Sequence, residues 1–122
     1  MSHAKSSNQY IDVDEQEDLW HRIHKSHIKI ENGIVRPSSA AFKGNDVSVD
    51  IGRKTTPQKS IGDSAALAGF KASVPIQLGH RVVEDPIIPE NPAHALILGK
   101  INKRKARLIR DNSEWVIKPT IL

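Results

Sequence analysis

The sequence predicts a single α+β domain of two layers, in which about two helices pack on a small mixed sheet. The 122 residues of the chain suffice for one hydrophobic core but not for two. A short apolar run at residues 94–98 indicates a buried strand, and alternating apolar and polar residues at 47–51 indicate a half-buried one. Residues 100–112 contain neither glycine nor proline and predict a helix. We therefore expect a flexible acidic N-terminal tail, residues 1–18, followed by one domain, residues 19–122.

The helix predicted at 100–112 has two contrasting sides. At about 100° per residue, one side gathers four apolar residues, namely Ile101, Ala106, Leu108 and Ile109. Lys105 interrupts that side, so its aliphatic stem must pass the core before its ammonium group reaches water. A further strand is expected at 115–117. If this strand runs parallel to 94–98 in one sheet, the helix is a right-handed crossover whose apolar side covers the sheet.

The opposite side of this helix is cationic. It carries Lys103, Arg104, Arg107 and Arg110, and the patch is extended by Lys100 and Lys118. The formal net charge of the chain is +4, which favours an anionic partner. We therefore predict a small accessory or interaction module without chemistry of its own, which binds a partner protein through this helix. The alternative is a protein that binds nucleic acid or another polyanion; because no aromatic residue lies among the cations, such binding would be insensitive to base sequence.

Local signals predict the remaining elements. Trp20 and Ile23 can share a helical face, and Asn32-Gly33 is a turn that favours a hairpin over residues 27–35. Further along, the sequence predicts a helix that opens at Thr56-Pro57, a helix after Asp63-Ser64 with Leu67, Phe70 and Val74 on its buried face, a strand at 80–83 and a stiff connector at 84–92.

An enzyme is the second alternative, a small transferase or hydrolase that uses His94 with Arg36 and Ser38. His94 opens a predicted strand directly after a proline-rich turn, where a strand end can present a side chain to a cleft. Arg36, Ser38 and Ser39 together can form a corner that binds phosphate. The competing interpretation of His94 is a histidine whose ring is satisfied by backbone hydrogen bonds at a strand edge.

Three histidines are the only metal-ligand pattern that the sequence offers. His21, His24 and His27 lie at intervals of three, which on a helix brings neighbouring rings close enough to share a metal ion. The competing interpretation is three solvated or partly buried histidines. The chain has no cysteine, which excludes disulfides and zinc sites with cysteine ligands. We expect no cofactor.

An acidic cluster near the N-terminus admits two interpretations. It comprises Asp12, Asp14, Glu15, Glu17 and Asp18. These carboxylates suit the solvated first turn of a helix, or they form an acidic arm that folds over the cationic helix and competes with an anionic ligand. The sequence contains neither a leader-like apolar segment nor an apolar run of about 18 residues, so we expect a cytoplasmic protein that does not enter the membrane.

Three segments carry a resemblance to a known group of proteins. They are RPSSAAF at 36–42, VSVDI at 47–51 and NPAHALILG at 91–99, with Trp20 upstream and Trp115-Val116 downstream. Together they resemble a family of short uncharacterised bacterial proteins of about this length. The resemblance implies a single domain over nearly everything after the acidic cluster, and it implies no activity, cofactor or partner.

Overall fold

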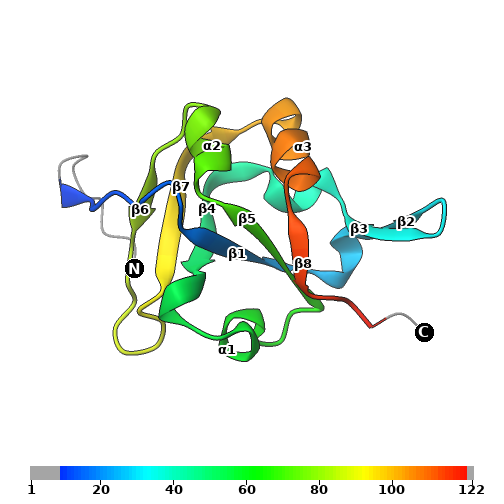
Figure 1. The fold of residues 1–122 in the computed structure, drawn as a ribbon, viewed down its shortest axis with the longest axis horizontal. Helices are drawn as coiled ribbons and strands as arrows, with labels where there is room; N and C mark the ends of the chain where they lie inside the picture. Colours follow the sequence, from blue (N-terminus) through cyan, green and yellow to red (C-terminus); the bar gives the residue numbers. More distant parts are fainter. Residues whose placement is uncertain (1–8, 121–122) are drawn as a thin grey trace.

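The computed structural model describes residues 9–120, and a single antiparallel sheet runs through the centre of the molecule (Figure 1). Its six strands lie in the order β6-β7-β4-β1-β5-β8. Their bounds are β1 Asp18–Ile23, β4 Gly44–Ile51, β5 Ala66–Lys71, β6 Val82–Glu84, β7 His94–Ile101 and β8 Glu114–Ile117. A separate hairpin of β2 (Ile28–Glu31) and β3 (Ile34–Pro37) projects from one side. The predicted α+β fold class is confirmed.

Every pairing within the six-stranded sheet is antiparallel. Four such pairings separate β7 from β8, so these two strands run in the same direction, as the crossover hypothesis required. They are not neighbours, however, because β4, β1 and β5 lie between them. The helix that joins them therefore crosses almost the whole width of the sheet.

Three α-helices and several short 3-10 helices complete the fold. They are α1 (Pro57–Ile61), α2 (Ser73–Gln77), α3 (Lys103–Asp111), η2 (Lys25–His27), η3 (Ser39–Phe42) and η4 (Gly52–Lys54). In Figure 1, α2 and α3 lie together on one side of the sheet, and α1 lies on the other. The predicted helix start at Pro57 is confirmed, because the Thr56 side chain accepts a hydrogen bond from the backbone N–H of Lys59.

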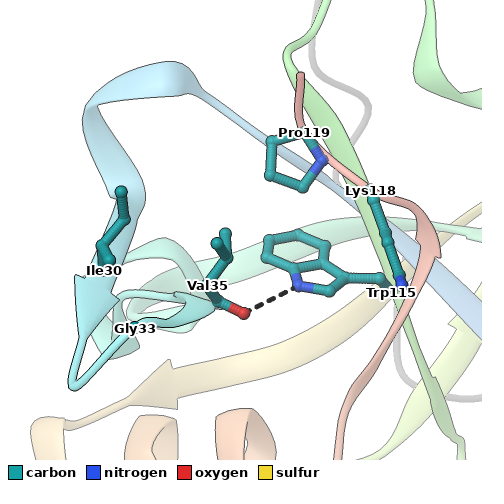
Figure 2. A pocket seen from close by; sticks show the side chains of 6 residues that line it. All are labelled: Ile30, Gly33, Val35, Trp115, Lys118 and Pro119. Atoms are coloured by element: carbon teal, nitrogen blue, oxygen red, sulfur yellow. Dashed lines mark hydrogen bonds between the residues drawn. The ribbon is translucent and has the colours of Figure 1, made fainter. Parts of the chain in front are cut away.

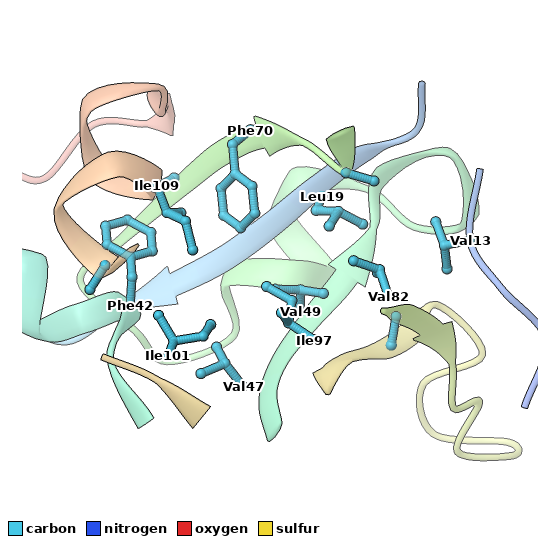
Figure 3. Packing of buried hydrophobic residues seen from close by; sticks show 14 of the residues in the cluster. Val13, Leu19, Phe42, Val47, Val49, Phe70, Val82, Ile97, Ile101 and Ile109 are labelled. Carbon is cyan, nitrogen blue, oxygen red and sulfur yellow. The ribbon is translucent and has the colours of Figure 1, made fainter. Parts of the chain in front are cut away.

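The main hydrophobic core fills the space between the sheet and the layer of α2, α3 and η3 (Figure 3). Alternate residues of each strand point into it, because side chains of a strand face opposite sides of the sheet in turn. Among the side chains that meet there are Leu19, Val49, Phe70, Ile97, Ile101 and Ile109. Burial of each such side chain contributes about 1.5–3 kcal/mol to stability, so this core dominates the energetics of the fold.

The prediction of a helix after Asp63 is wrong for its first half, where the structure has strand β5. Ala66, Leu67 and Ala68 are all fully buried, because α1 covers one face of β5 while the main core covers the other. A strand that is buried on both faces shows no alternation, and its apolar run then matches a helical period by accident. Gly69 lies within this strand, where an added Cβ would lie 2.8 Å from the Val116 side chain and 3.2 Å from Trp20.

The helical face suggested for Trp20 and Ile23 is also wrong, because both residues lie in strand β1.

The N-terminal boundary lies earlier than predicted. Residues 11–17 are part of the domain, and Val13 is buried in the core. The N–H of Val13 donates to the carbonyl of Val82 at 2.8 Å, and Asp12 forms a β-bridge with Val83, so this segment covers the outer edge of β6. The expected flexible tail is therefore wrong from residue 11 onward, and its first eight residues lie outside the described part of the chain.

Both interpretations of the acidic cluster are wrong. No α-helix forms over residues 10–18, and three of the five carboxylates bond cations of the sheet and its loops instead of α3. Asp12 pairs with Arg81 at 2.8 Å, Asp18 pairs with Lys71 at 2.9 Å, and Glu17 accepts hydrogen bonds from the Arg53 guanidinium.

Candidate functional site

Helix α3 is held on the domain by a cap and by its apolar face. The Asn102 side chain accepts a hydrogen bond from the N–H of Lys105 at 2.9 Å, which satisfies one free donor of the first turn. Ala106 and Ile109 are fully buried and pack toward η3. The helix is one turn shorter at its start than predicted, because Lys100 and Ile101 belong to β7. Its position leaves the other face of α3 directed toward solvent.

The exposed face of α3 carries cations that the domain does not neutralise. Lys103, Arg104 and Arg107 are exposed, and none has a carboxylate partner among residues 9–120. The other five arginines of the chain all form ion pairs, namely Arg22, Arg36, Arg53, Arg81 and Arg110. The two arginines left without an ion pair in the described structure are thus neighbours on one helix face, because residues at i and i+3 are adjacent there.

Two lysines outside the helix extend this surface. Lys43 and Lys103 line the same small hollow of about 150 Å³ beside η3. Lys100 is exposed on β7, opposite Asn45 of β4 and three residues before Lys103. We call the five residues Lys43, Lys100, Lys103, Arg104 and Arg107 the α3 basic patch.

Two residues of the predicted cationic surface lie outside this patch. Arg110 is engaged with its neighbour Asp111, whose Oδ1 accepts from both Nε and Nη2 of Arg110 at 3.0 and 2.9 Å. The same oxygen accepts from Nη2 of Arg36 at 3.0 Å. Lys118 follows the far end of β8 and lines a cavity against the β2–β3 hairpin. Neither residue is available where the sequence predicted it.

Lys105 is half-buried, as its place on the apolar side of α3 indicated. Its ammonium group lies 3.3 Å from Nε2 of His80, a buried histidine. Nδ1 of His80 lies 2.7 Å from the carbonyl of Leu98. A ring that donates from Nδ1 and accepts at Nε2 satisfies both contacts, since a carbonyl only accepts and an ammonium group only donates. This Lys105–His80 contact joins α3 to the loop before β6.

The structure does not bring the predicted catalytic residues together. His94 is almost buried, and its Nδ1 lies 2.9 Å from the carbonyl and 3.1 Å from the carboxylate of Asp85. His94 pairs with Asp50 at one end of β4, whereas Arg36 and Ser38 precede η3, which enters the opposite end of that strand. Eight residues of extended chain separate the two ends by about 25 Å. The interpretation of His94 as a ring satisfied by its own turn accounts for these contacts.

The structure does not show the anion-binding corner predicted for Arg36, Ser38 and Ser39. The Ser38 hydroxyl accepts a hydrogen bond from the N–H of Ala40 at 3.2 Å and caps η3, and the residue is buried. The Arg36 guanidinium is engaged with Asp111 and lies 3.9 Å from Glu31. Both side chains hold the local structure and do not converge on a common point.

The histidine triplet does not form a metal site. The segment is not one continuous helix: His21 lies in strand β1, His24 caps the short 3-10 helix η2, and His27 ends η2. The His21 ring is placed between two carbonyls, 2.9 Å from Ser48 and 2.6 Å from Ala41, whereas His24 contacts Ser26. Across the described part of the chain, no group of three or more His, Asp or Glu side chains is arranged to hold a metal ion.

The setting of His21 predicts a pH-dependent stability. Burial lowers the pKa of His21 from its ordinary value of 6.5, and this outweighs the hydrogen bonds to Ala41 and Ser48, which raise it. The unfolded chain therefore binds a proton at a higher pH than the folded one. The stabilisation by neutral His21 is fully present above about pH 6.5 and is lost as the pH falls toward the folded-state pKa.

Denaturant unfolding of the wild type and of His21→Gln between about pH 5 and about pH 8 checks this expectation. We expect the difference in the free energy of unfolding to be largest at the upper end and to narrow as the pH falls. His24→Gln, at an exposed ring, is the control, and its free energy of unfolding should vary with pH as that of the wild type does. Parallel curves for the wild type and His21→Gln would show that His21 does not titrate as described.

Sequence reasoning missed a buried carboxylate. The alternation at 47–51 assigns Asp50 to the exposed face of a half-buried strand, yet it is buried, and it accepts hydrogen bonds from the Ser60 hydroxyl and the Asn91 amide, both at 2.7 Å. Arg22 lies 3.8 Å from the same carboxylate. The partners lie in three separate segments, namely α1, β1 and the loop before β7. No local sequence pattern could therefore predict this network.

The described helices include none with the length and apolar character needed to cross a bilayer. Comparison of the chain with protein-family models, with curated proteins and with solved structures finds no match.

Proposed function

We propose that this domain is a small interaction module that docks an anionic surface of a partner protein through the α3 basic patch. The observation that carries the proposal is the distribution of ion pairs. Five arginines are paired within the domain, whereas Arg104 and Arg107 remain exposed, without a carboxylate partner in the described structure. Cations left unpaired on a rigid helix are ready to bind carboxylates of another molecule.

The composition of the exposed helix face favours a protein partner. Leu108 lies beside Arg107 and one turn after Arg104, and it is 38% exposed although it is a large apolar residue. Protein interfaces are enriched in arginine and in apolar side chains that become buried on binding, and arginine is frequent among the residues that dominate the affinity. The Arg104–Arg107–Leu108 surface has this mixed character.

Reversal of the charge at Arg104 and Arg107 tests the proposal. We expect Arg104→Glu/Arg107→Glu to weaken partner binding by at least about tenfold, because each new carboxylate would face a carboxylate of the partner. The matched control is Lys25→Glu/Lys29→Glu, which makes the same change of charge at two exposed lysines near the hairpin. The measurement is cross-linking capture from nuclease-treated native extract, followed by titration of the captured protein.

The outcome of that titration decides the proposal. A partner that survives nuclease treatment, is lost with the α3 variant and is kept with the control supports it. Equal capture by both variants and the wild type would overturn it.

Binding of nucleic acid is the second candidate, and the continuity of the α3 basic patch favours it. Lys43 and Lys103 line one hollow, Arg104 and Arg107 follow on the exposed face of α3, and Lys100 lies three residues before Lys103, so several cations could contact phosphates at once. The patch contains no aromatic side chain for base stacking. Retention on mixed-sequence DNA that collapses between low and moderate salt would favour this function, and absence of retention at low salt would remove it.

A further inference from the structure

A second surface feature lies away from the α3 basic patch, between the β2–β3 hairpin and the end of β8. A cavity of about 590 Å³ lies there, and Figure 2 shows the side chains that line it. Its lining comes from two segments of the chain and comprises Ile30, Gly33, Val35, Trp115, Lys118 and Pro119. Its volume lies within the range of about 300–1,000 Å³ that is usual for small-molecule sites.

The walls of this cavity are largely apolar and are held in place. The indole N–H of Trp115 donates to the carbonyl of Val35 at 3.1 Å, which fixes the ring against β3. Figure 2 shows the indole between Val35 and Pro119. Because its N–H is already bonded, the indole presents only its apolar surface to the cavity. A flat or branched apolar group can therefore pack against it.

The hairpin leaves apolar surface open at the same place. Ile30, which lines the cavity, is 59% exposed. The turn that follows β2 is tight, since Asn32 and Gly33 both have positive φ, so the hairpin cannot fold this side chain back on itself. Exposed apolar surface beside a cavity is typical of a binding groove.

Lys118 supplies the one charge of the lining. Its side chain is exposed and has no carboxylate partner among residues 9–120, and the other five lining residues carry no charge. A largely apolar cavity whose lining includes a single lysine is complementary to a molecule with an apolar body and one carboxylate.

We propose that the cavity between the β2–β3 hairpin and the end of β8 binds a small apolar carboxylic acid. The apolar body packs on Trp115 and Val35, and the carboxylate pairs with the ammonium group of Lys118. The size of the cavity suits an eight-carbon chain or a single aromatic ring with a short acid arm. This site is independent of the proposed docking through α3, and it can be present or absent whatever α3 binds.

Titration of the full chain with octanoate and with 4-phenylbutyrate tests the proposal. The chain has two tryptophans, so the indole N–H signals in a ¹H–¹⁵N spectrum separate Trp115 in the cavity from Trp20 outside it. We expect a saturable shift of the Trp115 signal with a dissociation constant of about 0.1–1 mM for at least one acid. Octanol, which has the same chain without charge, should bind at least about tenfold more weakly.

Two variants and a control test how Lys118 and the cavity wall contribute to binding of the acid. Lys118→Met keeps the aliphatic stem and should weaken acid binding about tenfold without changing octanol binding. Ile30→Glu places a competing carboxylate at the cavity and should abolish acid binding. Ile88→Glu makes the same change at an isoleucine that is 71% exposed in the loop before β7, and it should bind like the wild type.

Three results would overturn the proposal. They are the absence of a saturable Trp115 shift up to about 5 mM of either acid, equal binding of octanol and octanoate, and an equal effect of Ile30→Glu and Ile88→Glu. All of these variants change exposed side chains, and their native spectra confirm folding before any titration.

Discussion

Replacement of Phe42 by alanine is expected to lower the free energy of unfolding by about 3–5 kcal/mol, the range for a fully buried phenylalanine. Phe42 ends η3 and is 1% exposed. Its ring centroid lies 5.4 Å from that of His21 and 6.0 Å from that of Phe70, the latter in an edge-to-face arrangement. The substitution removes both ring contacts and leaves a cavity directly beneath α3, so it should also loosen the helix that carries the basic patch.

Denaturant unfolding followed by circular dichroism measures this loss. Phe42→Leu retains most of the apolar volume and should lose clearly less stability than the alanine variant. If Phe42→Ala lost no more than about 1 kcal/mol, the core would not depend on the η3 ring as the structure indicates.

Replacement of Asp50 by alanine is expected to cost about 3 kcal/mol of stability, since two hydrogen bonds to a buried charged group are lost together. The donors left without a partner are the Ser60 hydroxyl and the Asn91 amide. Ser60 is itself buried, and it lies in α1. The carboxylate therefore holds α1 and the loop before β7 against the end of strand β4, and both should loosen when it is removed.

The same unfolding measurement applied to Asp63→Ala provides the control for Asp50. Asp63 is exposed in the turn after α1, and its loss should change stability by no more than about 0.5 kcal/mol. Equal losses for the two variants would show that the Asp50 network contributes nothing beyond an ordinary surface carboxylate. A double variant, Asp50→Ala/Ser60→Ala, should recover part of the loss, because it removes one of the two unsatisfied donors.

Elements whose signals are local could be predicted from the sequence. Asn32-Gly33 determines the hairpin by itself, because both residues adopt the positive φ that a two-residue turn requires. The strand at 47–51 has apolar residues with a period of two, although Asp50 on its polar side is buried, and the helix within 100–112 has one buried and one exposed face. By contrast, β5 is covered on both faces, so its period carries no information about the type of element.

The candidate site shows the same division between local and tertiary information. The cationic face of α3 follows from helical spacing alone, and its exposure agrees with the prediction for Lys103, Arg104 and Arg107. Which cations remain unpaired depends on contacts between distant segments, as in the pair of Arg53 with Glu17. Arg110 is the exception, because its partner Asp111 is the next residue and the loss of that charge from the patch could have been foreseen.

The order of strands in the sheet has a consequence for synthesis of the chain. β1, β4 and β5 form the middle of the sheet and are complete by residue 71, and the later strands β7 and β8 add to its two sides. A nascent chain can therefore assemble the sheet from the inside outward in the order in which its strands leave the ribosome. The apolar face that α3 covers stays open until residues 103–111 have emerged, so a chain released before that point would expose it to water and to other incomplete chains.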